Sequence, residues 1–224
     1  MKTQKNKSSK NLPAGRIAPD LSPVLPPIAH AAEVFGGTEI EVRDCILENL
    51  EFTGLSPESI LFENCILNRI NFTRSKLSGL RLKDVRLVEC DFANSEAAAP
   101  KMIRVEFLNS RLTGFRAVEA ECQHLLISAG DASYSQFRYG VFQTSEFDSC
   151  NFSEADFHGS DLRGALLKSC NFKNVEMTGA KLEAADFRGS NVEGLVARTE
   201  DLQGAIVDPA QAMIFAELMG LKIR

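Results

Sequence analysis

The chain has 224 residues, with six cysteines, no tryptophan and a formal net charge of −5 at pH 7. No stretch approaches the roughly 20 consecutive apolar residues that a membrane-spanning helix needs, which excludes a helical membrane protein. The slightly acidic balance gives no reason to expect direct binding to nucleic acid.

Residues 1–38 precede the regular part of the chain and contain five of its eight prolines. The start is basic, as in a signal peptide, but prolines interrupt the only apolar candidate segment, Leu21 to Ile28. We therefore expect a disordered N-terminal tail over residues 1–38, whose last part, Ile28 to Phe35, lies over the first turn of the fold. We also expect the protein to be soluble and cytoplasmic.

From Val42 to Val207 an apolar or small residue returns every five positions in one register, which gives 34 repeat centres. The segment Ala155–Gly159 shows the unit: a small residue, a polar residue, the centre Phe157, then two polar or small residues. Twelve of the 15 phenylalanines are centres. At Phe115 and Ala117 the large and small roles are exchanged, which would conserve the local core volume. Fixed-period similarity of this kind indicates a repeat architecture.

A period of five fits neither the 3.6 residues of an α-helix nor the two of a simple strand. If the centre and the residue two before it both point inward, four such units close a square coil of 20 residues. Phe52, Phe72 and Phe92 would then stack in one column. With coils spaced like β-strands, 34 units form about 8.5 coils and a shaft of roughly 41 Å.

The unit resembles the pentapeptide-repeat family, whose pattern is a small residue, Asp or Asn, then Leu or Phe, and two further residues. The resemblance implies an all-β fold for residues 39–208, a right-handed quadrilateral β-helix with a solid core. It also implies reduced, buried cysteines at the small inward position. Those cysteines are Cys45, Cys65, Cys90, Cys150 and Cys170.

Residues 209–224 have a different character. Asp208-Pro209 provides a helix N-cap and first turn, and Gly220 a stop, which predicts a short C-terminal helix. One face must plug the last coil, and the remaining apolar residues favour a homodimer, with a monomeric cap as the alternative. The dimer interface would comprise Met213, Phe215, Leu218 and Met219.

Catalytic chemistry is hard to find in the sequence. The three histidines, His30, His124 and His158, have no partner at a spacing that would form a catalytic pair, and no Cys/His cluster of zinc type occurs. Aspartates before the centres face solvent and support turns, and the glycines at Gly159 and Gly164 occupy corners. A shaft filled with side chains offers no deep pocket. We therefore expect a non-enzyme without metal or cofactor.

The shaft from Ile40 to Asp208 carries 26 acidic and 18 basic residues. Qnr-type and MfpA-type members of the family are regarded as mimics of duplex DNA that bind DNA gyrase, and the ending from Asp201 to Gly220 resembles theirs. Duplex DNA of the same length would carry about 24 negative charges, against a net charge of −8 here. This chain also lacks the loops that interrupt Qnr-type repeats.

Apolar residues at outward positions form the second surface feature. Val88, Ile103, Leu108 and Val118 each follow a repeat centre in the middle of the shaft and are candidate partner-binding residues. Val88 and Leu108 are 20 positions apart, hence on one face. Alternatively, distortion at Pro100 buries some of them.

These observations predict a non-enzymatic macromolecule-binding protein. The most specific candidate partner is DNA gyrase or topoisomerase IV, which the chain would bind as a partial DNA mimic and protect from poisons, a form of antibiotic resistance. The alternative is a structural scaffold, whose tail and apolar patch recruit an unrelated partner protein.

Overall fold

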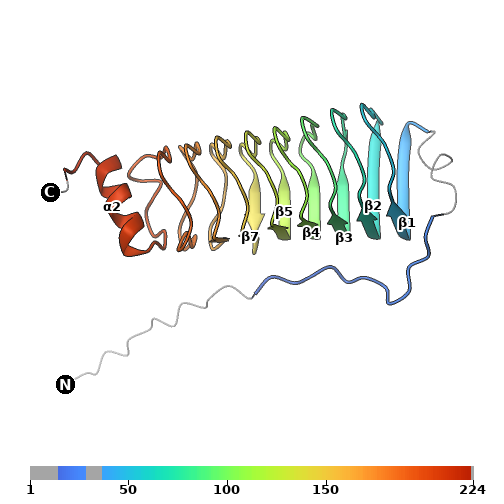
Figure 1. The fold of residues 1–224 in the computed structure, drawn as a ribbon, viewed down its shortest axis with the longest axis horizontal. Coiled ribbons are helices and arrows are strands. Elements are labelled where there is room, and N and C mark those ends of the chain that lie inside the picture. The colour runs from blue at the N-terminus through green and yellow to red at the C-terminus, as the bar shows by residue number, and fades with distance from the viewer. Residues whose placement is uncertain (1–14, 29–36, 223–224) are drawn as a thin grey trace, which may run out of the picture.

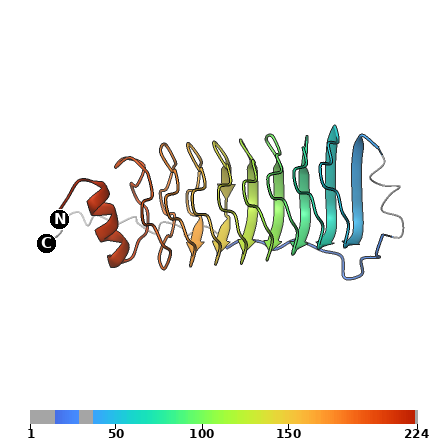
Figure 2. The ribbon, with the colours of Figure 1, turned by 45° about the horizontal axis from the view of Figure 1, so that its top comes forward.

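A parallel β-solenoid, closed at one end by a helix, dominates the computed structural model, which describes residues 15–28 and 37–222 (Figures 1 and 2). Within those ranges the strands are β1 (Glu39–Glu48), β2 (Ser59–Asn68), β3 (Arg81–Val88), β4 (Lys101–Leu108), β5 (Glu121–Ser128), β6 (Val141–Gln143), β7 (Glu146–Asp148) and β8 (Leu166–Lys168). The helix is α2 (Pro209–Leu218). In the described residues no helix has the length and apolar character needed to span a membrane.

Consecutive coils pair with a constant offset of 20 residues. Val42 pairs with Phe62 between β1 and β2, and the same offset continues through isolated bridges as far as Asp186 and Ile206. The predicted coil length is therefore confirmed. Each coil has four faces, numbered here by their repeat centres: the first at positions 42, 62 and onward to 182, the second at 47 to 187, the third at 52 to 192, and the fourth at 57 to 197.

Each position of the five-residue unit has its own conformation. The centre and the residue two before it are buried, as Phe157 and Ala155 illustrate. The residue two after the centre has a φ between 45° and 79° in most units, which turns the corner between two faces. Most of these corner residues are not glycine, and hydrogen bonds between coils, such as Arg74 N–H to the Ala93 carbonyl at 3.0 Å, hold them in this conformation.

The core is continuous from the first coil to the last. The predicted phenylalanine column is confirmed, with ring centroids 5.6 Å apart between Phe52 and Phe72 and 4.9 Å between Phe72 and Phe92. Phe115 is buried in place of a central residue, as the exchange with Ala117 predicted. All six cysteines are buried and unpaired, so they pack as small apolar residues.

Polar residues before the centres support the turns, as the sequence suggested. The Asp156 and Asp186 carboxylates accept the N–H groups of the residues two positions later. On the third face, Asn191, Asn171 and Asn151 form an amide ladder, with N···O distances of 3.0 Å between successive coils. These side chains are therefore structural.

The helix α2 closes the C-terminal end of the solenoid. Asp208 caps it in a capping box with Gln211, as the Asp-Pro sequence predicted. The buried Gln211 side chain donates to the carbonyls of Phe187 and Ser190, at 2.6 and 2.7 Å. Phe215 packs into the core. The helix α2 thus covers the last coil with hydrogen bonds from Gln211 and apolar contacts from Phe215.

Residues 15–28, called the strap here, lie alongside the solenoid and cross β1 to β5 (Figures 1 and 2). Ile46 of β1 donates to the Pro26 carbonyl at 2.9 Å and accepts from Ile28 at 3.0 Å, so the strap covers part of the open edge of the first coil. The sequence predicted disorder for the whole tail, whereas this stretch has a defined path. The predicted cover by Ile28 to Phe35 falls, apart from Ile28, outside the described residues.

Candidate partner-binding surfaces

The four candidate partner-binding residues lie on three different faces. Val88 and Leu108 are neighbours in the β3–β4 ladder on the second face, and both are half-buried. Ile103 lies on the first face and Val118 on the fourth. The structure therefore brings only Val88 and Leu108 together directly, while Ile103 and Val118 flank the edge between the fourth and first faces.

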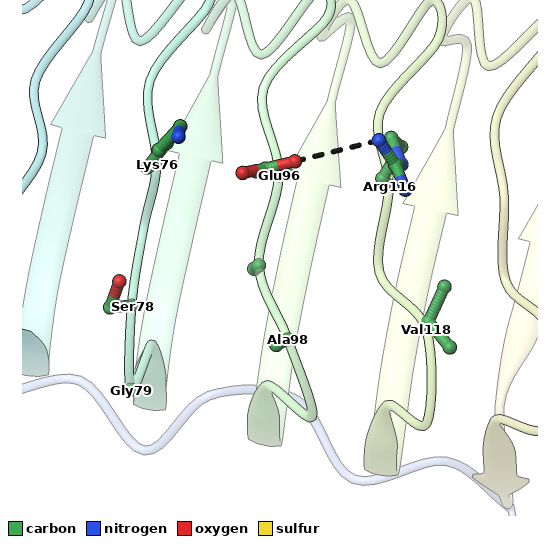
Figure 3. Close-up of a pocket in the computed structure, with 8 residues that line it drawn as sticks. Lys76, Ser78, Gly79, Glu96, Ala98, Arg116 and Val118 are labelled. Atoms are coloured by element: carbon green, nitrogen blue, oxygen red, sulfur yellow. Dashed lines mark ion pairs between the residues drawn. The ribbon is translucent and has the colours of Figure 1, made fainter.

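A shallow hollow of about 330 Å³ on the fourth face includes Val118 (Figure 3). Glu96 and Arg116 form an ion pair at 3.6 Å in one row, and Ala98 and Val118 lie in the row below it (Figure 3). The hollow exists because Ala98 presents only a methyl group where neighbouring coils carry larger side chains. Its floor is apolar and its upper rim is charged.

A second hollow, of about 430 Å³, lies on the adjoining first face. Ile103 and Val141, each 36% exposed, contribute apolar surface, and Gln123 and Gln143 contribute amides. Lys101 and Glu121 pair across it at 2.9 Å. Both hollows thus combine exposed apolar groups with paired charges.

Tyr139 lies on the corner between these two faces and was not identified from the sequence. The residue is 49% exposed, and its ring centroid lies 5.5 Å from that of His158 and 5.7 Å from the Arg138 guanidinium carbon. The sequence offered one signal, a tyrosine at the position two after a repeat centre, where the chain turns. The structure gives Tyr139 a φ of 58° there, a conformation that bulky residues seldom adopt. The name edge surface is used below for the following residues: Ala98, Ile103, Val118, Arg138, Tyr139, Val141 and His158.

The strap occupies a different corner, between the first and second faces. The Asn64 and Asp84 side chains accept the N–H groups of Ser22 and Asp20, at 2.9 and 2.8 Å. The Ile17 N–H donates to Nδ1 of His124 at 3.3 Å. Three strap amides are therefore bound by side chains of the solenoid.

Two carboxylates are buried under the strap. Glu106, 5% exposed, accepts from Arg16 of the strap at 3.0 Å and from Arg86 at 2.8 Å. Asp84, 6% exposed, accepts two bonds of 2.5 Å from Arg104. Burial acts to raise the pKa of Asp84, but the guanidinium of Arg104 and the Asp20 N–H outweigh it, so this pKa lies below its ordinary value.

His124 belongs to the same environment. Burial, followed by the positive charges of Arg104 and Arg16, lowers its pKa. An acceptor at Nδ1 requires a neutral imidazole with its proton on Nε2. His124 therefore lies at an outer corner of the shaft in contact with the strap.

The charges of the shaft are distributed and mostly paired. Ion pairs connect adjacent coils on several faces, for example Lys83 with Glu63 at 2.5 Å and Arg111 with Asp91 at 3.3 Å. Acidic and basic side chains occur on each of the four faces. The net charge of −8 is therefore spread around the rod.

Burial determines the protonation state of two core thiols. Burial raises the pKa of Cys65 to about 12 and that of Cys90 to about 11, so both remain protonated at neutral pH. Within residues 15–28 and 37–222, no three His, Cys, Asp or Glu side chains gather where they could hold a metal ion.

The candidate dimer residues divide into two groups. Phe215 is 7% exposed and belongs to the core of its own chain, so it is not available to a second copy. Met213, Leu218 and Met219 are exposed on the outer side of α2. The apolar surface left at this end is thus smaller than the sequence suggested.

The family model for pentapeptide repeats matches residues 60–94 and 150–191, in eight copies. Both segments belong to the pentapeptide-repeat family. The same coil continues between the two matched segments, where β4 and β5 maintain the 20-residue offset. No curated protein matches the sequence.

Solved pentapeptide-repeat structures are similar to it at low identity. A trypsin-treated variant of QnrB1, described as a plasmid-mediated fluoroquinolone resistance protein, is 23% identical with a TM-score of 0.36, and the match covers 83% of this chain and 89% of that one. HetL from the cyanobacterium Nostoc, involved in heterocyst differentiation regulation, is 16% identical with a TM-score of 0.32, over 79% and 96%. A thylakoid-lumen protein from Arabidopsis thaliana is 18% identical with a TM-score of 0.39, over 48% and 71%.

Proposed function

We propose that this protein is a non-enzymatic, rigid rod that binds another protein through the edge surface. The observation that supports this most is the exposed Tyr139, which lies on the corner between the two faces that carry the hollows, to which Val118 and Ile103 contribute apolar surface. Function in a filled solenoid must be carried by its outer faces. The edge surface is the part of the described exterior where these features coincide.

Physical chemistry supports this choice of surface. Tyrosine and arginine are enriched among the residues that dominate binding energy, and such anchors are surrounded by contacts that exclude water. Tyr139 and Arg138 are already in contact with each other, so little side-chain freedom is lost on binding. The continuous core fixes the spacing between hollows, which pre-organises the surface for a partner.

The test is capture of cellular proteins by the full-length chain, with a matched pair of substitutions. Tyr139→Ala combined with Val118→Asp should remove a specific partner, because both changes act on the edge surface. Tyr134→Ala is the control, since Tyr134 is also exposed on a corner but belongs to a different edge. Loss of the partner from the control as well, or retention by the double variant, would contradict the proposal.

DNA gyrase or topoisomerase IV is a second candidate for the partner, with protection from poisons as the outcome. The acidic net charge of the shaft and the residues from Asp201 to Gly220 favour it. The pairing of acidic with basic side chains limits the mimicry to part of the charge of DNA.

A supercoiling assay with a fluoroquinolone, with and without the protein, tests this second candidate. Relief of inhibition that disappears with rising salt would support an electrostatic mimic. Unchanged inhibition together with no binding to either enzyme would reject it while leaving the edge surface open to another partner.

A further inference from the structure

Three of the residues that bind the strap share one repeat position. Asn64, Asp84 and His124 each lie two residues after a first-face centre, so they line up along the corner in the second, third and fifth coils. Asp44 and Arg104 occupy the same position in the first and fourth coils. This column presents one polar side chain per coil, at intervals of roughly 4.8 Å.

The side chains of this column bind mainly backbone groups of the strap. The N–H groups of Ile17, Asp20 and Ser22 each donate to one of its side chains. Every residue except proline carries such a donor, so these three bonds do not depend on the side chains of the strap. The column therefore matches an extended chain of varied sequence.

Side-chain selection comes from a few inward residues. Arg16 enters the ion pair with Glu106, and the Ser22 hydroxyl accepts from Asn64 at 2.7 Å. Pro19, Leu21, Leu25 and Ile28 are half-buried. Prolines at Pro19, Pro23, Pro26 and Pro27 keep the strap extended between these contacts. Proline-containing segments are favoured ligands because they lose little conformational entropy on binding.

The strap is held only on one side. Val24 is 82% exposed and Ile17 is 55% exposed, so the outward half of the strap contributes almost no buried apolar area. Segments with few buried contacts open at low free-energy cost compared with the core of the same protein. The strap can therefore be exchanged while the solenoid stays folded.

We propose that this corner, formed by Asn64, Asp84, Arg104, Glu106 and His124 and called the strap site, is a recognition site for an extended, proline-containing segment of a partner protein. The strap is its intramolecular ligand and keeps the site closed. The required ligand has an arginine that pairs with Glu106 and a free N–H opposite Asp84. The strap site lies at the opposite side of the first face from Val118 and Tyr139, so substitutions at these two residues test the edge surface independently of the strap site.

The test uses the full-length chain and a fluorescent peptide with the sequence of residues 15–28. A tethered segment competes at an effective concentration on the order of millimolar, so the intact chain should bind the peptide weakly. The variant Arg16→Glu with Leu25→Ser should bind it at least about tenfold more tightly, because its own strap no longer pairs with Glu106. Fluorescence anisotropy gives both affinities, and far-UV circular dichroism checks the solenoid.

Two modified peptides test the recognition of the backbone. Replacing Asp20 of the peptide with proline removes the N–H that Asp84 accepts and should weaken binding about tenfold. Proline at Val24, which is exposed, is the matched control and should bind like the parent peptide. Equal affinities for these two peptides would overturn the recognition mode.

The opened variant also decides between occupants. If it binds the peptide no better than the intact chain while remaining folded, the strap site is not an exchangeable site. If the intact chain instead forms a dimer that the peptide dissociates, the occupant is the strap of a second copy, and the assignment to a partner protein is overturned. A monomer that binds the peptide as described supports the proposal.

Discussion

The first five coils and the later coils differ in the length of their β-strands. In β1 to β5 one strand of eight to ten residues runs along both the first and second faces. Beyond β5 the strands have three residues, as in β6 and β7, or reduce to single bridges. The strap contacts the long strands, and its Ile17 N–H donates to His124 in the last of them.

The inward residues at the corner between the first and second faces change along the shaft. The position two before the second-face centre holds Cys45, Cys65, Val85, Val105 and Leu125 in the long strands, and Ser145 and Ala165 beyond them. The branched residues Val85, Val105 and Leu125 favour extended backbone, whereas Cys45 and Cys65 show that a small residue is also compatible with a long strand. The position two after the first-face centre also changes after β5. It holds large polar residues as far as His124, and then Thr144, Gly164 and Ala184.

The comparison teaches that one repeat can carry two surfaces. Where the corner column is polar, the solenoid binds a polypeptide along its axis. Where it is small, none of the strap contacts lies along the shaft, and the stability of the shaft rests on phenylalanine packing. Four changes test this division, beginning with the largest expected effect.

Phe157→Ala should lower the free energy of unfolding by about 4 kcal/mol, because the ring is fully buried and its removal leaves a cavity. The ring packs against Phe137, Phe147 and Phe152 at centroid distances of 5.1 to 6.1 Å. Leu67→Ala in the aliphatic half should cost about 3 kcal/mol. Urea denaturation measures both, and a loss below 1 kcal/mol for Phe157→Ala would contradict the assigned role of the phenylalanine core.

Phe215→Ala should lower stability by about 3 kcal/mol through loss of the C-terminal plug. Met213→Ser together with Leu218→Ser should change stability little, because both side chains are exposed. If α2 forms a homodimer through this surface, the second pair of changes should yield a monomer by light scattering. An unchanged mass would leave α2 as a cap alone.

Asp84→Ala should cost about 2 kcal/mol, since it removes a buried acceptor of both Arg104 and the Asp20 N–H. The matched change at the same column position beyond the strap, Thr144→Ala, should cost less than about 0.5 kcal/mol. Hydrogen exchange should show the strap amides opening only in the first variant. Equal effects at the two positions would remove the distinction between the two halves.

Acid should loosen the strap before it affects the shaft. The pKa of His124 is lowered in the folded protein, so folding favours the neutral imidazole. At pH values above the ordinary histidine pKa of about 6.5, His124 costs no free energy of folding. As the pH falls from there towards the lower folded-state pKa, His124 increasingly destabilises the bound strap. Exchange of the Ile17 amide should accelerate in that range, and His124→Asn, which keeps an acceptor, should remove the pH dependence.

Several features of the fold could be predicted from residues alone. The exchange of Phe115 with Ala117, the phenylalanine column from Phe52 and the cap at Asp208 all follow from position within the unit. They are predictable because a solenoid couples each residue mainly to the residue 20 positions away. The proposed edge surface includes Ile103 and Val118, which the sequence indicated as candidates and which stay predictions. It also includes Tyr139, which the sequence did not indicate, because a five-residue period does not distinguish a polar corner residue from an aromatic one.

The sequence by itself determined the coil, since a five-residue period with apolar centres leaves few ways to bury Phe157 and its counterparts. Only the tertiary structure decided where residues 15–28 lie. Their composition resembles that of a disordered segment, and their order depends on hydrogen bonds to Asn64, Asp84 and His124, which belong to different coils. Contacts between residues 42 to 107 positions apart carry no local signal, so a pattern that fixes the shaft leaves its ligand undetermined.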